Sequence, residues 1–462
     1  MPYDKGDEKS ILYHASKLTG KTLKNFIEVG EDIIGGTRTK GIFGQVVEED
    51  YFQIKTNNSP KPDFQEVGIE LKVTPMKKTK DGLVSKERLV LGNIDYKEVP
   101  TRHFNIFLDK DSHILIVFYL WQEGISIYDY EFLKVVNWKP TSEELRMIRE
   151  DWEVIEGYVI RGEAHLLSER HTKYLSACTK GAGHGKDMTS QPFSDKLAKH
   201  RALSFKSSFM TALYHSHNDI NEVLIDEISN DGGFASILHG GWNENESFEE
   251  HVTNYYQSFI GRTCSEIERM LGLDLNSGSK QYYSILAMAM AGIIGKRHIK
   301  EFEEADIQFK IIRTYQNGKP KESMSFPYIR FDRLVEQEWV DSDLFEDLDH
   351  EFFSPIFAFP TSTIKDCDRK DLIFKGAIFW RIPDKDFPEI GSVWLDTKNK
   401  VLNDDFDHFV KMSESPILHI RPHARDSSDM ASYRGKSVKK VSFWLKDTYI
   451  QKIIEDNLDN DK

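Results

Sequence analysis

Residues 62–72 read PDFQEVGIELK, and apolar side chains alternate with polar ones through positions 67–74. This alternation predicts a strand with one face in the core. Because side chains two residues apart on a strand share a face, Glu70 and Lys72 would lie side by side. Asp63 precedes Glu70 by seven positions, so a turn can return it to the start of the strand. The stretch therefore predicts two carboxylates and an ammonium at one point, although a solvated Glu-x-Lys face is the plainer alternative.

Two converging carboxylates suit a hard cation such as Mg²⁺. An adjacent ammonium such as Lys72 can orient an attacking water and stabilise charge that develops on a phosphate. Upstream, residues 40–48 read KGIFGQVVE, and Phe43 with the two valines suits the buried side of a helix. Glu48 could reach the same point from that helix, or it could be a surface residue near the helix end.

The composition limits the class of protein. The chain has 462 residues with 39% hydrophobic and 29% charged residues, which is typical of globular domains and ample for two or three of them. No apolar run approaches the ~20 residues that span a bilayer, and the charged N-terminus does not resemble a signal peptide. Three scattered cysteines argue against a disulfide framework, so we expect a cytoplasmic location without membrane contact. The net charge of −14 argues mildly against nucleic acid as a partner, although basic clusters occur at 71–90 and 191–206.

A weak internal repeat divides the chain. KEFEEADIQFK at 300–310 aligns without a gap to residues 62–72 at an offset of 310 − 72 = 238. Two further pairs keep nearly this offset, namely GKT at 20–22 with GRT at 261–263, and FKSSF at 205–209 with LKDTY at 445–449. Three patches in one order predict duplicated domains rather than a short-period solenoid.

The first half resembles a known nuclease family. K-G-x-x-G-x-x-x-E at 40–48, then P-D-F and G-I-E-L-K, are similar to the catalytic core of MutH, the mismatch-repair nicking endonuclease of the PD-(D/E)-x-K superfamily. The likeness continues through IREDWE (148–153) and the 165–183 stretch to SFKSSFMTAL (204–213). It covers nearly all of residues 1–214 with the motifs in family order.

The whole chain resembles two-domain restriction endonucleases of the Sau-3A-I type, which cut GATC and carry a second MutH-like domain without a working active site. SKERLVL (85–91), SACTKGA (176–182), KESMSF (321–326) and HIRPHA (419–424) carry this likeness. The internal repeat agrees with a second domain that lacks a working active site. Glu70 aligns with Gln308 at the offset of 238, and Glu48 aligns with Met288 at an offset of 240. Asp63 aligns with Glu301 and Lys72 with Lys310, so the second half keeps one of the three acids and the lysine.

The resemblance implies specific roles. Asp63 and Glu70, with the backbone carbonyl of Leu71, would bind Mg²⁺, while Lys72 and Glu48 would position or activate the water. The reaction would be hydrolysis of a phosphodiester of double-stranded DNA that leaves a 5′-phosphate and a 3′-hydroxyl. Lys180 is the main candidate for a contact to guanine, and Thr172 and Thr179 are less favoured candidates for base contacts. Three further residues are assigned to DNA binding in general, namely Lys40, Lys86 and Arg88. Arg421 and His423 are the candidates in the second domain.

We therefore expect a mixed α/β protein with two MutH-like domains, each a mixed central sheet flanked by helices. The expected boundaries are 1–214 for the catalytic domain, 215–247 for a linker and 248–462 for a degenerate DNA-binding domain that acts allosterically. One active site per chain and a palindromic site predict a monomer that pairs on DNA, and a cognate DNA methyltransferase is the expected genetic partner.

Three alternatives remain open at this point. A methyl-directed nicking endonuclease of mismatch repair would share the chemistry but has no evident need for a second domain. A non-catalytic DNA-binding regulator would not need the intact acid and lysine motif. A soluble metabolic enzyme would fit the acidic pI, but no phosphate loop of Walker or Rossmann spacing is present.

Overall fold

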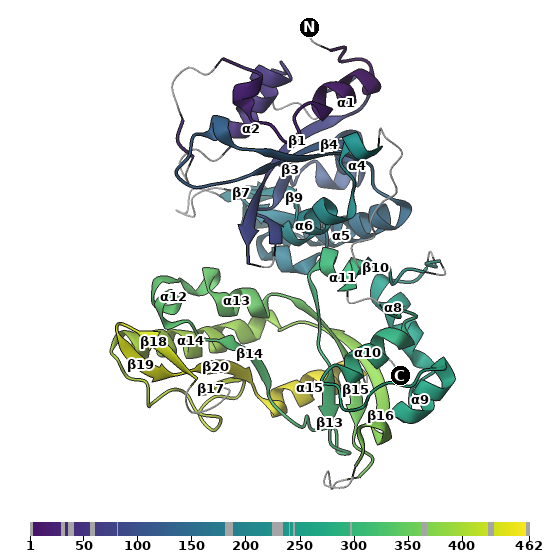
Figure 1. Ribbon diagram of the computed structural model, residues 1–462, viewed down its shortest axis with the longest axis vertical. Helices are drawn as coiled ribbons and strands as arrows, with labels where there is room; N and C mark the ends of the chain where they lie inside the picture. The colour runs from purple at the N-terminus through teal and green to yellow at the C-terminus, as the bar shows by residue number, and fades with distance from the viewer. Residues whose placement is uncertain are drawn as a thin grey trace. The chain divides into compact units, whose positions relative to one another are not determined.

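The computed structural model describes residues 3–28, 33–35, 41–55, 61–80, 82–180, 188–223, 234–239, 241–243, 245–295, 298–361, 367–423 and 429–458. The chain forms two compact units, residues 1–236 with 297–306, and residues 237–296 with 307–462 (Figure 1). The predicted mixed α/β class is confirmed, since each unit contains a mixed sheet with helices. The predicted boundaries at 214 and 248 stay a prediction. Among the described helices, none combines the length and apolar character needed to cross a bilayer.

The central sheet of the first unit has the order β2-β1-β4-β5. Its strands are β1 (Glu70–Thr79), β2 (Gly82–Ser85), β4 (Ile114–Leu120) and β5 (Phe132–Trp138). β1 and β4 are parallel, and the two outer strands are antiparallel to their neighbours. The strand predicted from residue 67 begins at Glu70, because residues 64–69 form a turn in which Gly68 has φ +70°.

Apolar side chains from this sheet form a core with the N-terminal helices. Leu71, Leu115 and Val135 pack with residues of α1 (Glu8–Ser16) and α2 (Ile42–Val46). The chain then continues from α2 into a π-helical turn, Val47–Tyr51, which carries Glu48.

A second sheet of the first unit has the order β3-β9-β6, and a hairpin of β7 and β8 follows β6. The strands are β3 (Leu89–Asn93), β6 (Leu175–Thr179), β7 (Met188–Gln191), β8 (Ser194–Lys199) and β9 (Arg201–Phe205). The accompanying helices are α3 (Val99–Arg102), α4 (Asn105–Asp111), α5 (Ser142–Ile160), α6 (Ser207–Ser216) and α7 (Ile220–Val223). The predicted capping box of α5 is confirmed, because Thr141 Oγ1 accepts from the Glu144 amide and Glu144 Oε2 accepts from the Thr141 amide.

A segment from the second half of the sequence belongs to the first unit. β10 (Phe234–Ala235) pairs with β11 (His298–Ile299), and α11 (Lys300–Ala305) packs on α6. Tyr174 Oη donates to Glu304 Oε2 at 2.5 Å, and Lys300 Nζ lies 3.5 Å from Glu304 Oε1. Burial raises the pKa of Glu304 to about 7. The helix is therefore held by polar contacts that are themselves buried.

Among the described residues, the second unit has a similar strand arrangement without a counterpart of β2. β15 lies between β16 on one side and both β12 and β13 on the other, a three-stranded sheet has the order β14-β20-β17, and β18 pairs with β19. The strands are β12 (Ile307–Phe309), β13 (Ile312–Thr314), β14 (Met324–Tyr328), β15 (Glu351–Ala358), β16 (Ile373–Trp380), β17 (Leu418–Pro422), β18 (Met430–Tyr433), β19 (Lys436–Lys439) and β20 (Val441–Leu445). β12 and β13 are parallel to β15, as β1 is to β4.

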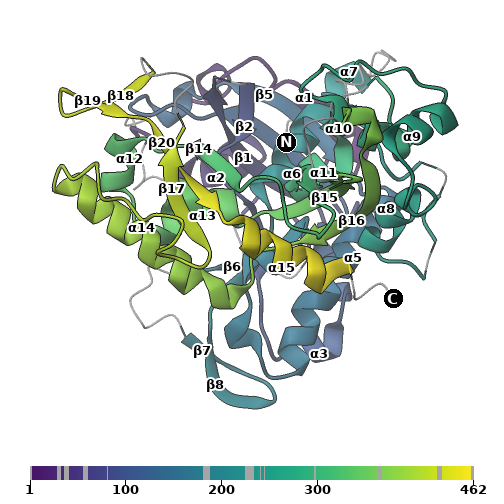
Figure 2. The same cartoon turned by 90° about the horizontal axis from the view of Figure 1, so that it is seen from below.

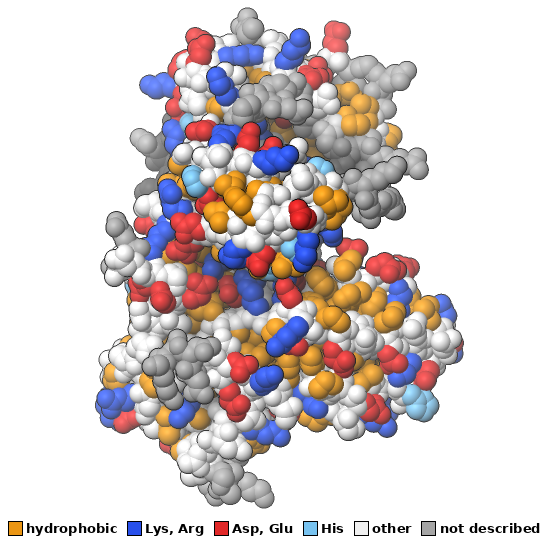
Figure 3. Space-filling view, turned by 180° about the vertical axis from the view of Figure 1, so that it is seen from behind, with side chains coloured by type: hydrophobic (Ala, Val, Ile, Leu, Met, Phe, Trp, Pro, Cys, Tyr) orange, Lys and Arg blue, Asp and Glu red, His pale blue; other side chains and the backbone are white. Residues whose placement is uncertain are grey.

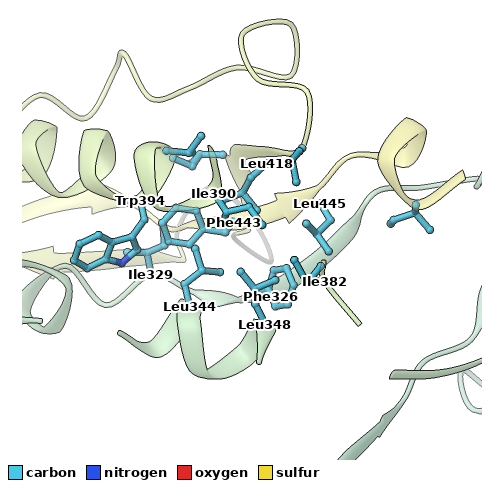
Figure 4. Packing of buried hydrophobic residues seen from close by; sticks show 14 of the residues in the cluster. Phe326, Ile329, Leu344, Leu348, Ile382, Ile390, Trp394, Leu418, Phe443 and Leu445 are labelled. Carbon is cyan, nitrogen blue, oxygen red and sulfur yellow. The ribbon is translucent and has the colours of Figure 1, made fainter. Parts of the chain in front are cut away.

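Helices pack on these sheets as well. They are α8 (Phe248–Gln257), α9 (Cys264–Leu271), α10 (Tyr282–Met290), α12 (Phe331–Glu336), α13 (Asp343–Leu348), α14 (Phe387–Leu402) and α15 (Asp447–Leu458). α14 contacts β17, and its course beside β17 and β20 is visible in Figure 2. Side chains such as Trp394, Leu418 and Phe443 fill the space between this helix and the sheet (Figure 4).

Hydrogen bonds at matching positions support the internal repeat. Gly20 has φ +74° and its amide donates to Phe132 O at 2.8 Å, while Gly261 has φ +81° and its amide donates to Phe374 O at 2.8 Å. The following threonines, Thr22 and Thr263, each begin a capping box. Both units thus have a left-handed glycine, a bond from it to the strand in the corresponding position and a cap two residues later, which supports the predicted repeat.

Strand register extends the correspondence to the motif. Glu70 pairs with Ile114, which pairs with Trp138, and Gln308 pairs with Phe352, which pairs with Trp380. Gln308 therefore takes the position in the second unit that Glu70 takes in the first.

Candidate active site

The start of β1 brings together the predicted acid and lysine residues. Lys72 Nζ lies 2.5 Å from Glu70 Oε1, which confirms that the two side chains share a face. The Leu71 amide donates to Asp63 Oδ2 at 3.0 Å, and the Asp63 amide donates to Glu70 Oε2 at 3.1 Å. The turn before β1 thus places Asp63 against the first residues of the strand, as the seven-residue spacing predicted.

Two more charged residues belong to the same cluster and were missed by the sequence analysis. Lys110 Nζ lies 3.4 Å from Glu70 Oε1, so the buried Glu70 carboxylate faces two ammonium groups. Asp111, the last residue of α4, is 4% exposed and interacts electrostatically with Lys72, Glu70, Lys110 and Asp63. No local spacing links these residues to the motif, since only the pairing of β4 beside β1 brings the end of α4 to the site.

Three acids at the site, Asp63, Glu48 and Asp111, lie in an environment that resists their ionisation. Burial, followed by the charge of Glu70, raises the pKa of Asp63 to about 6, although the Leu71 amide and Lys72 oppose this. Burial and then the charge of Asp63 raise the pKa of Glu48 to about 7, which shows that Glu48 shares the site. Burial raises the pKa of Asp111 to about 7.

Lys72 has the opposite balance. Burial alone would lower the pKa of its ammonium, but Glu70 and Asp111 more than offset this, so the pKa is raised. The lysine is therefore held as a cation at the site.

The donor set fits a divalent cation of the Mg²⁺ type. Asp63 and Glu70 supply two carboxylates and Leu71 a carbonyl, and Mg²⁺ in proteins is often held by one or two carboxylates with water and substrate phosphate. No closed cluster of three or more His, Cys, Asp or Glu ligands occurs within the ranges that the structure describes. The mutual repulsion of Asp63 and Glu70 is the feature that a bound cation would relieve.

An open cleft of about 820 Å³ lies over this cluster within the first unit. Glu48 and Lys72 line it together with four of the predicted DNA-binding residues, Lys86, Arg88, Thr179 and Lys180. Lys86 Nζ stands 4.4 Å from the centroid of the Trp121 ring, and Arg88 forms an ion pair with Glu169. Glu87 also lines the cleft and was not predicted. Lys40 lies outside the described residues.

The predicted recognition loop, residues 168–180, is only partly a loop. Residues 175–179 form β6, and Thr179 and Lys180 are exposed at its end. Thr172 is 2% exposed, and its hydroxyl donates to Glu169 O at 3.3 Å, so the structure does not bring it to the cleft. Thr172 directly follows a 3-10 turn before β6, whereas Thr179 and Lys180 lie at the far end of that strand.

The predicted contacts of the second unit lie at the matching strand end. Arg421 on β17 stacks on Trp444, with its guanidinium carbon 5.2 Å from the ring centroid. His423 follows the strand, and its ring lies 5.8 Å from the same tryptophan. Both side chains are exposed.

Charge elsewhere on the surface is mixed. On the face shown in Figure 3, blue basic and red acidic side chains are interspersed.

Comparison with known proteins gives a family for the chain. Residues 52–151 match the family "DNA mismatch repair enzyme MutH", a range that includes Asp63, Glu70, Lys72 and Asp111. The type II restriction enzyme Sau3AI of Staphylococcus aureus is 30% identical over 98% of this chain and 99% of its own length. The mismatch repair protein MutH of Shewanella woodyi is 28% identical over 37% of this chain and 74% of its own length. That of Serratia proteamaculans is 26% identical over 47% of this chain and 96% of its own length.

Proposed function

Since the chain belongs to the family of MutH-related type II restriction enzymes, we propose that it cuts both strands of DNA at the palindrome GATC in a Mg²⁺-dependent reaction. The products would carry 5′-phosphates. The observation that carries this proposal is the joint placement of Asp63, Glu70 and Lys72 below a cleft that is lined by basic residues.

The residues divide the chemistry among themselves. Asp63, Glu70 and the Leu71 carbonyl would hold Mg²⁺, which when bound supplies a Lewis acid and lowers the pKa of water. Lys72 Nζ, held as an ammonium, would donate to the attacking water or to a phosphate oxygen. Glu48, whose raised pKa shows that its ionised form is costly, would orient the water by accepting its hydrogen bond.

DNA would be held at two levels. Lys86 and Arg88 on the cleft wall would contact phosphates, which position the duplex without reading it. Lys180, exposed at the end of β6, would donate to guanine O6 or N7 in the major groove. The neighbouring Thr179 is a second candidate for a base contact.

The second unit would bind another copy of the site as an effector. Its strand order matches the first unit, but Gln308 replaces Glu70 and cannot supply an anionic ligand. Lys321 lies 5.3 Å from the centroid of the Phe359 ring, as Lys86 lies over Trp121, and both rings directly follow the strand that pairs with the motif. A binding surface without cleavage chemistry is the role that this combination supports, and it would couple to the first site.

The test is digestion of plasmid DNA with and without Mg²⁺ by the wild-type chain, Glu70→Ala and the matched control Gln308→Ala. We expect linear fragments with ends at GATC from the wild type and the control, and none from Glu70→Ala. Nicked circles alone would replace the restriction function with a repair-type nickase. Binding of GATC without cleavage would contradict the enzymatic proposal.

A further inference from the structure

Asp111 is a buried acid that the proposed chemistry does not yet use. It is 4% exposed, and its Oδ1 is buried without a hydrogen-bond partner among the described residues. A buried carboxylate oxygen without a partner costs on the order of 1–3 kcal/mol or more. The position therefore needs an explanation other than packing.

The place of Asp111 in its helix makes a structural role less favourable still. It ends α4, where the helix dipole carries partial negative charge and a carboxylate is unfavourable. Asparagine has nearly the same shape and would remove this charge. Stability alone would thus favour Asn at this position, and acids retained against stability are typical of functional sites.

The groups around Asp111 indicate what it serves. Strand pairing sets Ile114, three residues after Asp111, opposite Glu70, and Glu70 Oε1 lies 2.5 Å from Lys72 Nζ and 3.4 Å from Lys110 Nζ. Asp111 interacts electrostatically with Lys72 in this cluster. In the metal-free chain Lys72 Nζ pairs with Glu70 Oε1 at 2.5 Å. A divalent cation on Glu70 would draw off the charge of this carboxylate and repel the Lys72 ammonium, so ligation by Glu70 leaves the buried ammonium in need of another acceptor.

We propose that Asp111 is a positioning residue of the cleavage reaction, which accepts the Lys72 ammonium when Glu70 serves as a metal ligand. This rests on the proposed function. Held between Asp111 and the scissile phosphate, Lys72 Nζ keeps its direction toward the phosphate. Asp111 acts through Lys72 and touches neither substrate nor metal.

The second unit offers a matched control. Asp349 precedes Phe352 by three residues, as Asp111 precedes Ile114, and Lys310 follows Gln308 as Lys72 follows Glu70. The acid and the lysine thus recur where the metal-binding acid does not. Asp349→Asn tests what such a substitution costs in the fold alone, and Asp109→Asn removes an exposed acid from α4 itself.

The first experiment measures cleavage and DNA binding. Single-turnover cleavage by Asp111→Asn should be slower by about 10- to 100-fold, the usual effect of an outer partner of a metal site. The dissociation constant for GATC DNA, measured with Ca²⁺ in place of Mg²⁺, should stay within twofold, and Asp109→Asn and Asp349→Asn should cut at the wild-type rate. A rate within twofold of wild type, or an equal loss of DNA affinity, would overturn the proposal.

The second experiment needs no activity. The melting temperature is measured in saturating Ca²⁺, which would engage Glu70 without supporting cleavage, for Asp111→Asn, Lys72→Met and the double variant. If Asp111 pairs with Lys72, the change caused by Asp111→Asn is more stabilising in the Lys72→Met background, because the carboxylate has then lost its cation. Additive changes would overturn the pairing even if cleavage fell. A wild-type chain that cuts no DNA would refute the proposed function, while this cycle would still report on the pair.

Discussion

The strand that carries Glu70 and Lys72 runs unbroken from Glu70 to Thr79, whereas its counterpart in the second unit is split into β12 and β13. β1 is parallel to β4, and β12 is parallel to β15, which has the corresponding position in its sheet. A residue in the left-handed region precedes each strand, Gly68 in the first unit and Asp306 in the second. Backbone geometry and pairing are thus kept where the acid is lost. The scaffold and the chemistry of this fold are therefore separable.

The turn before each strand shows the same separation. In the first unit, Pro62 and Gly68 disfavour a helix in the segment directly before β1. Asp63 therefore lies in a turn that returns to β1. The aligned segment of the second half has neither residue and forms α11. The repeat alignment had left Glu301 as a retained acid, but Glu301 Oε1 accepts from Ser236 Oγ at 2.6 Å within the first unit. Glu301 therefore does not play the part of Asp63.

The largest expected effect comes from making the first unit resemble the second. Glu70→Gln copies Gln308 and removes an anionic ligand, so single-turnover cleavage should fall by on the order of 10²- to 10³-fold or more. Binding of GATC DNA in Ca²⁺-free buffer should change little, because the cleft cations remain. The converse, Gln308→Glu, should not create a second active site, since the acid that would match Asp63 is bonded elsewhere. Cleavage by Glu70→Gln within tenfold of wild type would remove the basis of the comparison.

Sequence patterns predicted those parts of the site that depend on local spacing. The period-two alternation placed Glu70 beside Lys72, and the capping box placed the start of α5. Sequence patterns did not predict Lys110 and Asp111, which lie some forty residues after the motif in sequence. The pairing of β4 with β1 brings them to the site. Sequence patterns also did not predict that α11 belongs to the first unit, because tertiary contacts such as the hydrogen bond from Tyr174 to Glu304 place it there.

A second prediction distinguishes the role of Lys180 in the first unit from that of Arg421 in the second. Lys180→Ala should lower kcat/KM at every site by roughly 5- to 150-fold, the value of about 1–3 kcal/mol for a specific base contact. Arg421→Ala should leave cleavage of a one-site substrate unchanged and abolish only the faster cleavage of a two-site substrate. Rates on matched one-site and two-site DNA measure both effects. Equal loss on both substrates for Arg421→Ala would show that the second unit is a clamp rather than an effector.

A third prediction concerns pH. The raised pKa values of Asp63, about 6, and Glu48, about 7, mean that the metal-free folded chain binds these protons more tightly than the unfolded chain does. The two protonated acids contribute fully to the free energy of unfolding below the pKa values of the unfolded chain, which lie at about 4. This contribution is lost as pH rises through the folded pKa values of about 6 and 7. Because a cation needs the ionised acid, the Mg²⁺ concentration for half-maximal cleavage should fall as pH rises from about 6 to 8.

Melting curves of the metal-free chain supply the other half of this test. The melting temperature should decline as pH rises from about 4 to about 7, and Asp63→Asn should flatten the decline. Asp347 in the second unit has a pKa raised by burial to about 6, so Asp347→Asn should flatten the decline as well but leave the Mg²⁺ dependence unchanged. A Mg²⁺ dependence that is independent of pH would contradict the assignment of Asp63 as a ligand.

The smallest expected effect tests the scaffold itself. Gly20 and Gly261 have φ of +74° and +81°, and a Cβ at either would meet no atom within 4 Å, so alanine would be strained by the backbone alone. We expect Gly20→Ala and Gly261→Ala each to cost roughly 1–2 kcal/mol in unfolding free energy. At about 2–4 °C per kcal/mol for units of this size, each should lower the melting temperature of its own transition by a few degrees. Gly92→Ala, at an open position outside the left-handed region, is the control and should be near neutral. Matching losses would show that the two units keep the same turn for the same physical reason, whereas a loss in only one would confine the correspondence to topology.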